Sequence, residues 1–145
     1  MICRALRSAR CWNGISRECS PIRRPEAVTS LISTARAGGV TFWSIHKEGM
    51  LAGCGALKML DGAHGEIKSM RTADAFLRQG VAARMLGHII AEARALGVER
   101  LSLETGSGAA FEPALALYRH HGFEDCELFA DYRPDPFSRF MTRRL

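Results

Sequence analysis

From residue 38 onward, the order of apolar and polar residues predicts strands first, and then helices that alternate with strands. Residues 40–46 are rich in β-branched and aromatic side chains, and residues 51–60 form a second apolar run, so a turn at 47–49 would join them in a hairpin. Asp61-Gly62 is a further turn signal. The predicted strands are 40–46, 51–60, 66–72, 100–105, 123–129 and 138–142.

Two segments have the period of a helix instead. Over residues 80–96, apolar side chains recur at three- and four-residue steps, at Ala82, Met85, Leu86, Ile89, Ala93 and Leu96. Gly97 then ends the helix. Residues 112–121 are predicted as the second helix, with Pro113 in its first turn and Gly122 after its end. The order β-β-β-α-β-α-β-β indicates an α+β fold, with a mixed and mostly antiparallel sheet flanked by helices.

The first 37 residues differ from the rest of the chain, because they show no sustained period of either kind. They hold seven Arg, no Lys and two acidic residues, whereas residues 38–145 hold thirteen basic and thirteen acidic residues. The net charge of +5 therefore belongs to this segment, and the neutral body argues against nucleic acid as a partner. We expect two parts, an atypical segment at 1–37 and a domain at 38–145. A mitochondrial transit peptide is the weaker explanation of the Arg-rich start.

Composition excludes several other classes of protein. No apolar run approaches the roughly 18 residues that a membrane span needs. The 5 cysteines are odd in number and contain no CxxC pair, so neither a zinc site nor a disulfide framework is indicated. Free thiols fit a reducing cytoplasm, which is the location we expect.

The segment LRQGVAARML, at residues 77–86, raises the first question of chemistry. The first N–H groups of a helix have no partner inside the helix, and the helix dipole adds partial positive charge there. Gly80 and Ala82 would let a pyrophosphate approach the backbone, and Arg78 would add a formal charge. An ordinary helix start with small residues for close packing explains the same stretch, and the decapeptide alone favours that explanation.

Neighbouring motifs change this balance, because their order and spacing resemble the GNAT superfamily of acyl-CoA N-acyltransferases. LRQGVA lies where that family carries its pyrophosphate loop, and LYRHHGF at 117–123 resembles its later Leu-Tyr-x-x-x-Gly-Phe motif. More narrowly, the YsnE-like small bacterial subgroup is similar over AGCGALK, HGEIKSMRT, LSLETGS, FEPALALY and FADYRPDPFSRFMTRRL. The resemblance covers about residues 40–145. It implies the GNAT fold and transfer of an acetyl group from acetyl-CoA to an amine.

The resemblance also implies which residues bind the co-substrate. The strand residues Met70, Arg71 and Thr72 would offer backbone hydrogen bonds to the pantetheine arm and the acetyl carbonyl. The pyrophosphate would be held by N–H groups of Arg78, Gln79, Gly80, Val81, Ala82 and Ala83. Two positions depart from the family pattern. Leu77 stands where the family prefers Gln or Arg, and Phe111 stands where many members have an Asn.

Acetyl transfer to an amine needs a base. A lysine-like amine with a pKa near 10.4 costs about 4.6 kcal/mol to deprotonate at pH 7. Glu66 lies on a strand where some family members carry their base, and Glu104 at the end of the next strand is the other candidate. For each glutamate the alternative is a purely structural, partly exposed side chain paired with Lys68 or Arg100.

The reaction also needs an oxyanion donor and an acid. A strand N–H near Met70 to Thr72 could meet the oxygen that gains charge. Tyr118 occupies the tyrosine position of the family and is the expected acid toward the departing CoA thiolate. The alternative for Tyr118 is a buried tyrosine that packs under Phe123.

Histidines and cysteines give weaker signals. Adjacent helical residues such as His120 and His121 are expected to point apart, and no cluster of ligands surrounds them, so we expect no metal. Cys54 and Cys126 are predicted to be small core residues.

Several polar residues near the end of the chain have two interpretations. Asp131, Tyr132 and Asp135 lie in a loop that could line the acceptor site or could merely turn the chain. Arg71 could meet an acidic group of the acceptor or could lie at the surface.

Residues 1–37 do not resemble the first strand and helices that wall the acceptor site in the family. One choice of common codons for Gly14 to Thr34, read in the frame shifted by two bases, encodes the peptide HLAGMFADSPPGSGHVPDLD. This peptide resembles the YsnE-like pattern. Because the codons are a free choice, they show only that such a peptide can be encoded. Our hypothesis is that this segment is an out-of-frame translation, which incompatible codons in the gene would refute. As written, the chain should have a poorly packed start, an incomplete acceptor wall and weakened activity.

The sequence thus predicts an enzyme, an acetyl-CoA-dependent N-acetyltransferase that acts by direct transfer on a small-molecule amine. No nucleic acid, membrane or metal takes part. The alternatives are a non-catalytic acyl-CoA-binding sensor domain and an inactive frameshifted product. The oligomeric state stays open, with a homodimer as one option, and the acceptor cannot be identified from the sequence.

Overall fold

A computed structural model describes residues 30–145, which form one sheet and two helices. The sheet has seven strands in the order β1-β2-β3-β4-β5-β7-β6, and only the β4–β5 pair is parallel. The strands are β1 (Ser30–Ala37), β2 (Val40–Lys47), β3 (Met50–Met59), β4 (His64–Thr72), β5 (Arg100–Gly106), β6 (Glu124–Asp125) and β7 (Ser138–Arg144). The predicted α+β class, with a mixed and mostly antiparallel sheet, is confirmed.

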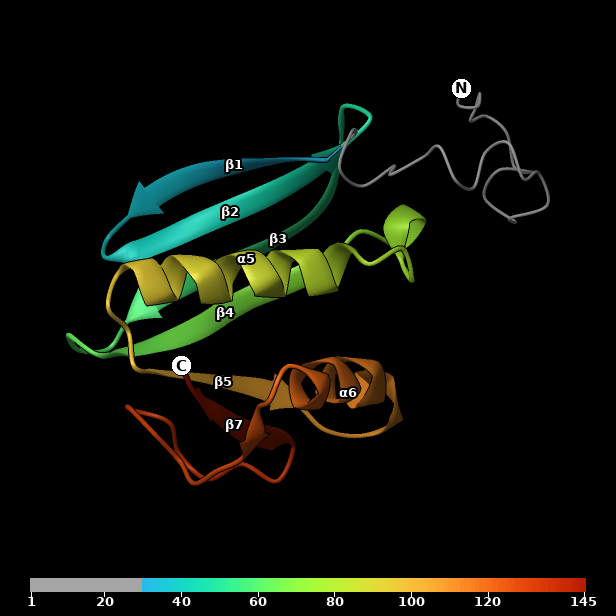
Figure 1. Ribbon diagram of the computed structural model, residues 1–145. Helices are drawn as coiled ribbons and strands as arrows, with labels where there is room; N and C mark the ends of the chain where they lie inside the picture. Colours follow the sequence, from blue (N-terminus) through green and yellow to red (C-terminus); the bar gives the residue numbers. More distant parts are fainter. Residues whose placement is uncertain (1–29) are drawn as a thin grey trace.

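Both helices lie on the same face of the sheet (Figure 1). Helix α5 (Val81–Ala95) covers β2, β3 and β4, and α6 (Glu112–His120) lies beside β5 and β7. Short 3₁₀ turns at Asp74–Phe76 and Ala109–Phe111 precede them. The main core fills the space between helices and sheet, and its fully buried side chains include Ile45, Met85, Leu86, Ile89, Leu101, Leu103, Leu115 and Met141.

Glycine on β3 allows α5 to lie close to the sheet. A Cβ atom added at Gly55 would lie 2.9 Å from side-chain atoms of Ile89, Met70 and Met85. Contacts this short do not occur between real Cβ atoms and their neighbours, so a larger residue would force these side chains to shift. Glycine at this position therefore lets Met85 and Ile89 of α5 pack directly on β3.

Strand β1 was not predicted. It pairs with β2 along its full length, from Ser30↔Lys47 to Ala37↔Val40, so the sheet begins before the expected domain boundary at residue 38. Residues 33–37 are exposed, and of residues 32–37 only Ile32 packs against the core, so this part of the strand shows no alternating pattern. Residues 1–29 lie outside the described part of the chain. The hypothesis of an out-of-frame segment therefore stays a prediction for the DNA sequence to test.

The strand predicted at 123–129 is wrong for most of its length, because only Glu124–Asp125 pairs as β6. After Cys126, whose N–H donates to the carbonyl of Phe140 (2.9 Å), the chain leaves the sheet edge. The loop at 126–137 then carries Phe129 and Tyr132 back onto Phe140. This packing between aromatic rings outweighs further strand pairing.

Candidate active site

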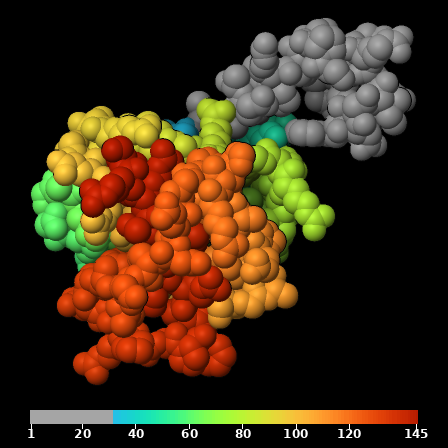
Figure 2. Space-filling view, turned by 60° about the horizontal axis from the view of Figure 1, so that its bottom comes forward, coloured from blue at the N-terminus to red at the C-terminus, as the bar shows by residue number. Residues whose placement is uncertain are grey.

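A cavity of about 540 Å³ lies between the start of α5 and the start of α6. In Figure 2 the yellow-green residues that precede α5 lie beside the orange residues of α6. Small and apolar side chains dominate the walls, so the backbone is accessible to a ligand. The lining residues are Met70, Arg71, Thr72, Phe76, Leu77, Arg78, Gly80, Val81, Ala82, Ala83, Ala110, Pro113, Ala114, Leu117 and Tyr118.

The two parallel strands part beside this cavity. Strand β4 pairs with β5 only from His64↔Arg100 to Ile67↔Leu103, although both strands continue beyond those residues. At Ser69 the backbone has φ 58°, and the register between β3 and β4 shifts at the same place. Such a bulge bends a strand away from its neighbour. The last residues of β4 are thereby left without β5 as a partner on that side.

The start of α5 carries no cap. Gly80 precedes the helix in the left-handed conformation, with φ 80°, and no side chain accepts a hydrogen bond from the first-turn N–H groups. The first turn contains no acidic residue. Unpaired N–H groups and the positive end of the helix dipole therefore both face the cavity. Arg78, at φ 59°, supplies a cation next to them.

Gln79 is the exception among the residues expected to bind pyrophosphate, because its side chain serves the protein itself. Its amide oxygen accepts a hydrogen bond from the buried Lys47 Nζ (3.0 Å), and its amide nitrogen donates to the carbonyl of Ala75 (3.2 Å). These bonds join β2 to the loop before α5. The pattern of residues did not reveal this role for Lys47, because its partner lies 32 positions away.

The packing of Tyr118 under Phe123 is confirmed, and its role as an acid stays a prediction. Its ring packs edge-to-face on Phe123, with centroids 5.9 Å apart, and it also lines the cavity. The side chain is 6% exposed, and burial raises the pKa of Tyr118 to about 12. Among the described residues, its hydroxyl has no hydrogen-bond partner. The phenol is therefore protonated at physiological pH and free to donate to a ligand.

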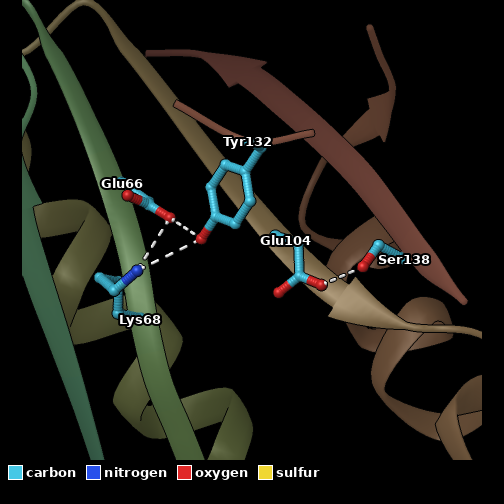
Figure 3. Close-up of polar contacts among 5 residues, drawn as sticks. All are labelled: Glu66, Lys68, Glu104, Tyr132 and Ser138. Carbon is cyan, nitrogen blue, oxygen red and sulfur yellow. Dashed lines mark hydrogen bonds and ion pairs between the residues drawn. The ribbon is translucent and has the colours of Figure 1, made fainter. Parts of the chain in front are cut away.

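The opposite face of the sheet carries a polar cluster around Glu66 (Figure 3). Neighbouring strand residues point to opposite faces, so Ile67 enters the core while Glu66 lies on the other side. One oxygen of Glu66, Oε1, accepts hydrogen bonds from the Tyr132 hydroxyl (2.5 Å) and from Lys68 Nζ (3.2 Å). Lys68 Nζ also donates to the Tyr132 oxygen (3.3 Å). Glu66 is only 2% exposed, so the expectation of a partly exposed glutamate is wrong for this residue.

Glu104 lies on the same face of the sheet but in a separate hydrogen bond. It accepts from the Ser138 hydroxyl (2.6 Å) and is half-buried. Neither glutamate lines the cavity that contains Tyr118. The three candidate catalytic residues therefore divide between the two faces, with the parted strands between them.

A second hydrogen-bond chain lies next to Glu66. Thr142 donates to the carbonyl of Leu101 (3.0 Å), so the Ser102 hydroxyl donates to Thr142 (3.0 Å) and accepts from His64 Nε2 (2.7 Å). This order places the histidine proton on Nε2. Burial, followed by the charge of Arg100, lowers the pKa of His64. The imidazole is therefore neutral at physiological pH.

Two minor expectations are corrected. The rings of His120 and His121 do not point apart, because they meet edge-to-face with centroids 5.5 Å apart, and His121 lies just beyond α6. Within residues 30–145, no group of three His, Cys, Asp or Glu side chains could hold a metal ion. Cys54 and Cys126 are half-buried rather than core residues. The Cys54 thiol donates to the carbonyl of Ser69 (3.4 Å), at the bulge of β4.

The two departures from the family pattern lie near the cavity. Leu77 lines it and is 53% exposed, so no charge replaces the usual side chain at that position. The Phe111 ring covers Gly106 at the end of β5, where an added Cβ would lie 2.5 Å from the ring. Phe111 thus covers the end of β5 with an apolar ring.

Parallel strands that part beside an uncapped helix start have the layout of an acyl-CoA N-acyltransferase, and solved structures agree. An acyl-CoA N-acyltransferase from Klebsiella pneumoniae superposes with a TM-score of 0.69 and 32% identity, over 74% of this chain and 73% of that one. A GNAT family acetyltransferase from Elizabethkingia anophelis with acetyl-CoA bound has a TM-score of 0.68 and 20% identity, over 81% and 99%.

The chain belongs to the acetyltransferase (GNAT) family, which it matches over residues 9–123. It is 57% identical to the N-acetyltransferase YsnE of Bacillus subtilis over 122 residues, which is 83% of this chain and 81% of that protein. The expected family is therefore confirmed, and with it the assignment to the acyltransferases. In the part of the chain that the structure describes, no helix is long and apolar enough to cross a membrane.

Proposed function

We propose that this protein transfers the acetyl group of acetyl-CoA directly to a small-molecule amine. The observation that carries the proposal is the parting of β4 and β5 beside the uncapped start of α5. This arrangement leaves backbone groups accessible at the two places where a pantetheine arm and a pyrophosphate need them. A solved neighbour that shares the fold has acetyl-CoA bound. We also propose that the protein acts in the cytoplasm.

The residues that line the cavity fit acetyl-CoA as co-substrate. Its pyrophosphate would take the N–H groups of Val81, Ala82 and Ala83, with Arg78 adding charge. Its pantetheine arm would follow the free side of β4 at Met70 to Thr72. Each contact between an anion and a helix terminus contributes roughly 0.3–2 kcal/mol, so several N–H groups must act together.

The acceptor would approach from the face of the sheet that carries the glutamates. Its amine nitrogen bonds to the acetyl carbonyl carbon, the carbon–sulfur bond breaks, and the ammonium proton passes to a carboxylate directly or through one water. We assign the carboxylate to Glu66, because its second oxygen, Oε2, has no hydrogen-bond partner among the described residues. Glu104 is the alternative base.

On the cavity side, Tyr118 would donate to the departing sulfur. A phenol whose pKa is about 12 is a weaker acid than a thiol, whose pKa is about 8.5. A complete proton transfer before the bond breaks is therefore uphill, and the phenol contributes chiefly a hydrogen bond to the developing thiolate. The thiolate of CoA would then take up a proton from solvent water.

The test combines binding with turnover. Calorimetry with acetyl-CoA measures binding, and CoA release measures turnover with amino acids, polyamines, amino sugars and aromatic amines. An enzyme binds acetyl-CoA and releases CoA with at least one amine. Binding without release for any amine would favour a sensor domain, and absence of binding would favour an inactive product.

The base is assigned by a matched pair of variants. Glu66→Gln should lower kcat by about 100-fold or more while acetyl-CoA affinity stays unchanged. Glu104→Gln is the control, since it removes a carboxylate from the same face of the sheet, and it should lower kcat by less than about threefold. The reverse result would assign the base to Glu104.

A further inference from the structure

The two carboxylate oxygens of Glu66 have different surroundings. Both hydrogen bonds that Glu66 receives, from Tyr132 and from Lys68, end on Oε1. Figure 3 shows the second oxygen turned away from both donors. A side chain that is 2% exposed and fixed at one oxygen cannot rotate freely. The free oxygen is therefore held in one place.

Tyr132 reaches this carboxylate from far along the chain. It lies 66 positions after Glu66, in the loop at 126–137, and its ring packs edge-to-face on Phe129 and Phe140 with centroids 5.3 Å away in each case. Phe140 lies on β7, and the loop is thereby attached to the sheet. The hydroxyl is thus a fixed donor, directed by three aromatic rings rather than by flexible side chains.

We propose that Tyr132 is a positioning residue for acetyl transfer: together with Lys68 it holds Oε1 of Glu66, so that Oε2 is oriented to receive the proton of the acceptor amine. The proposal rests on the proposed function and on Glu66 as its base. Tyr132 does not touch the reacting atoms. It acts through Glu66, and an acceptor site built in this way depends on the loop at 126–137.

The electrostatic surroundings of Glu66 support this division between its two oxygens. Across the sheet, Lys58 on β3 lies opposite Glu66, and on β4 itself Lys68 and His64 lie on the same face. The charge of Glu66 acts on His64, which burial keeps neutral. On the side of the loop, Tyr132 is the titratable group in contact, and burial followed by the hydrogen bond to Glu66 raises its pKa. Tyr132 therefore stays a donor throughout the working range of pH.

The test removes only the hydroxyl. Tyr132→Phe keeps the ring packing, so we expect kcat to fall about tenfold, with acetyl-CoA affinity unchanged. The loss should appear in kcat and not in KM for the amine, because Tyr132 acts through Glu66 and does not touch the acceptor. The assay uses CoA release with the best amine of the panel. In a Glu66→Gln background, Tyr132→Phe should cause no further loss, because Tyr132 acts through Glu66.

A control separates positioning from folding. Phe129→Leu loosens the same loop without removing a hydrogen bond, and it should lower kcat by less than Tyr132→Phe does. If Tyr132→Phe leaves kcat unchanged while Glu66→Gln is inactive, the role of Tyr132 is refuted and the base assignment stands. If Glu66→Gln turns over at the wild-type rate, the base assignment fails, and the role of Tyr132 fails with it.

Discussion

The two faces of the sheet differ in what they offer a substrate. The helix face presents backbone groups and the Tyr118 hydroxyl at a cavity lined mainly by small and apolar residues. The opposite face presents side chains, with Glu66 bound by Tyr132 and Lys68, and Glu104 bound by Ser138. A site made of backbone groups tolerates many different side chains as long as they are small. A site made of side chains depends on the individual atoms of those side chains. Substitutions on the two faces should therefore fail in different ways.

The largest effect is expected from charge placed at the start of α5. Ala82→Glu would put a carboxylate where the pyrophosphate should lie, so acetyl-CoA affinity should fall by about 100-fold or more. Calorimetry measures the loss. Ala91→Glu, on the exposed side of the same helix, is the matched control and should bind as the wild type does. If Ala82→Glu binds acetyl-CoA as the wild type does, the pyrophosphate does not bind at this helix start.

Tyr118→Phe should lower turnover rather than affinity. The lost hydrogen bond to the leaving sulfur should reduce kcat by about 10- to 100-fold, with acetyl-CoA affinity almost unchanged. Because burial raises the pKa of Tyr118 to about 12, the wild-type rate should show no loss from its ionisation up to about pH 10. A basic limb well below that pH, abolished in Tyr118→Phe, would contradict this account.

Arg78 should have a smaller effect, because its side chain is exposed. Arg78→Ala is expected to weaken acetyl-CoA binding by about threefold. Arg78→Gly should weaken binding equally but raise stability by about 0.5–1 kcal/mol, because glycine adopts a φ of 59° without strain. Thermal unfolding and calorimetry of both variants separate charge from backbone strain. If the acetyl-CoA affinity is unchanged in both variants, the N–H groups alone bind the pyrophosphate.

The smallest effect concerns stability on the face that carries the glutamates. The folded state lowers the pKa of His64 below its unfolded value of about 6.5. Its contribution to stability is therefore complete above about pH 6.5 and is lost as pH falls through the lowered pKa. His64→Gln keeps a donor for Ser102 but cannot titrate, so its melting temperature should fall less between about pH 7 and pH 5 than that of the wild type. An equal fall in both proteins would show that other groups cause it.

The same contrast between the two faces explains which parts of the structure could be predicted from the sequence. The helix face depends on local order, because Gly80, Ala82 and the period of α5 stand together in one short stretch. The helix could therefore be predicted, and the pyrophosphate site at its start stays a prediction. The polar face depends on contacts between distant residues. Nothing near Tyr132 in the sequence indicates that its hydroxyl meets Glu66. Residues 33–37 of the edge strand β1 are all exposed, so no alternating pattern marks them.

Burial could not be predicted for the same reason. Glu66 alternates like any half-exposed strand residue, but it is 2% exposed, and Tyr132 in the loop at 126–137 is one of the residues in contact with it. That loop was predicted in part as a strand, because aromatic residues such as Phe129 favour strands when only their neighbours in sequence are considered. In the structure, the packing of Phe129 on Tyr132 and Phe140 outweighs this local preference for a strand.

The account is tested most directly by titrating acetyl-CoA into Glu66→Gln and Ala82→Glu and measuring CoA release from the same preparations. If the two faces have separate tasks, Glu66→Gln should bind acetyl-CoA with the wild-type affinity but lose turnover. Ala82→Glu should lose binding. Loss of acetyl-CoA binding in Glu66→Gln, or wild-type binding in Ala82→Glu, would contradict the division of the site between the two faces.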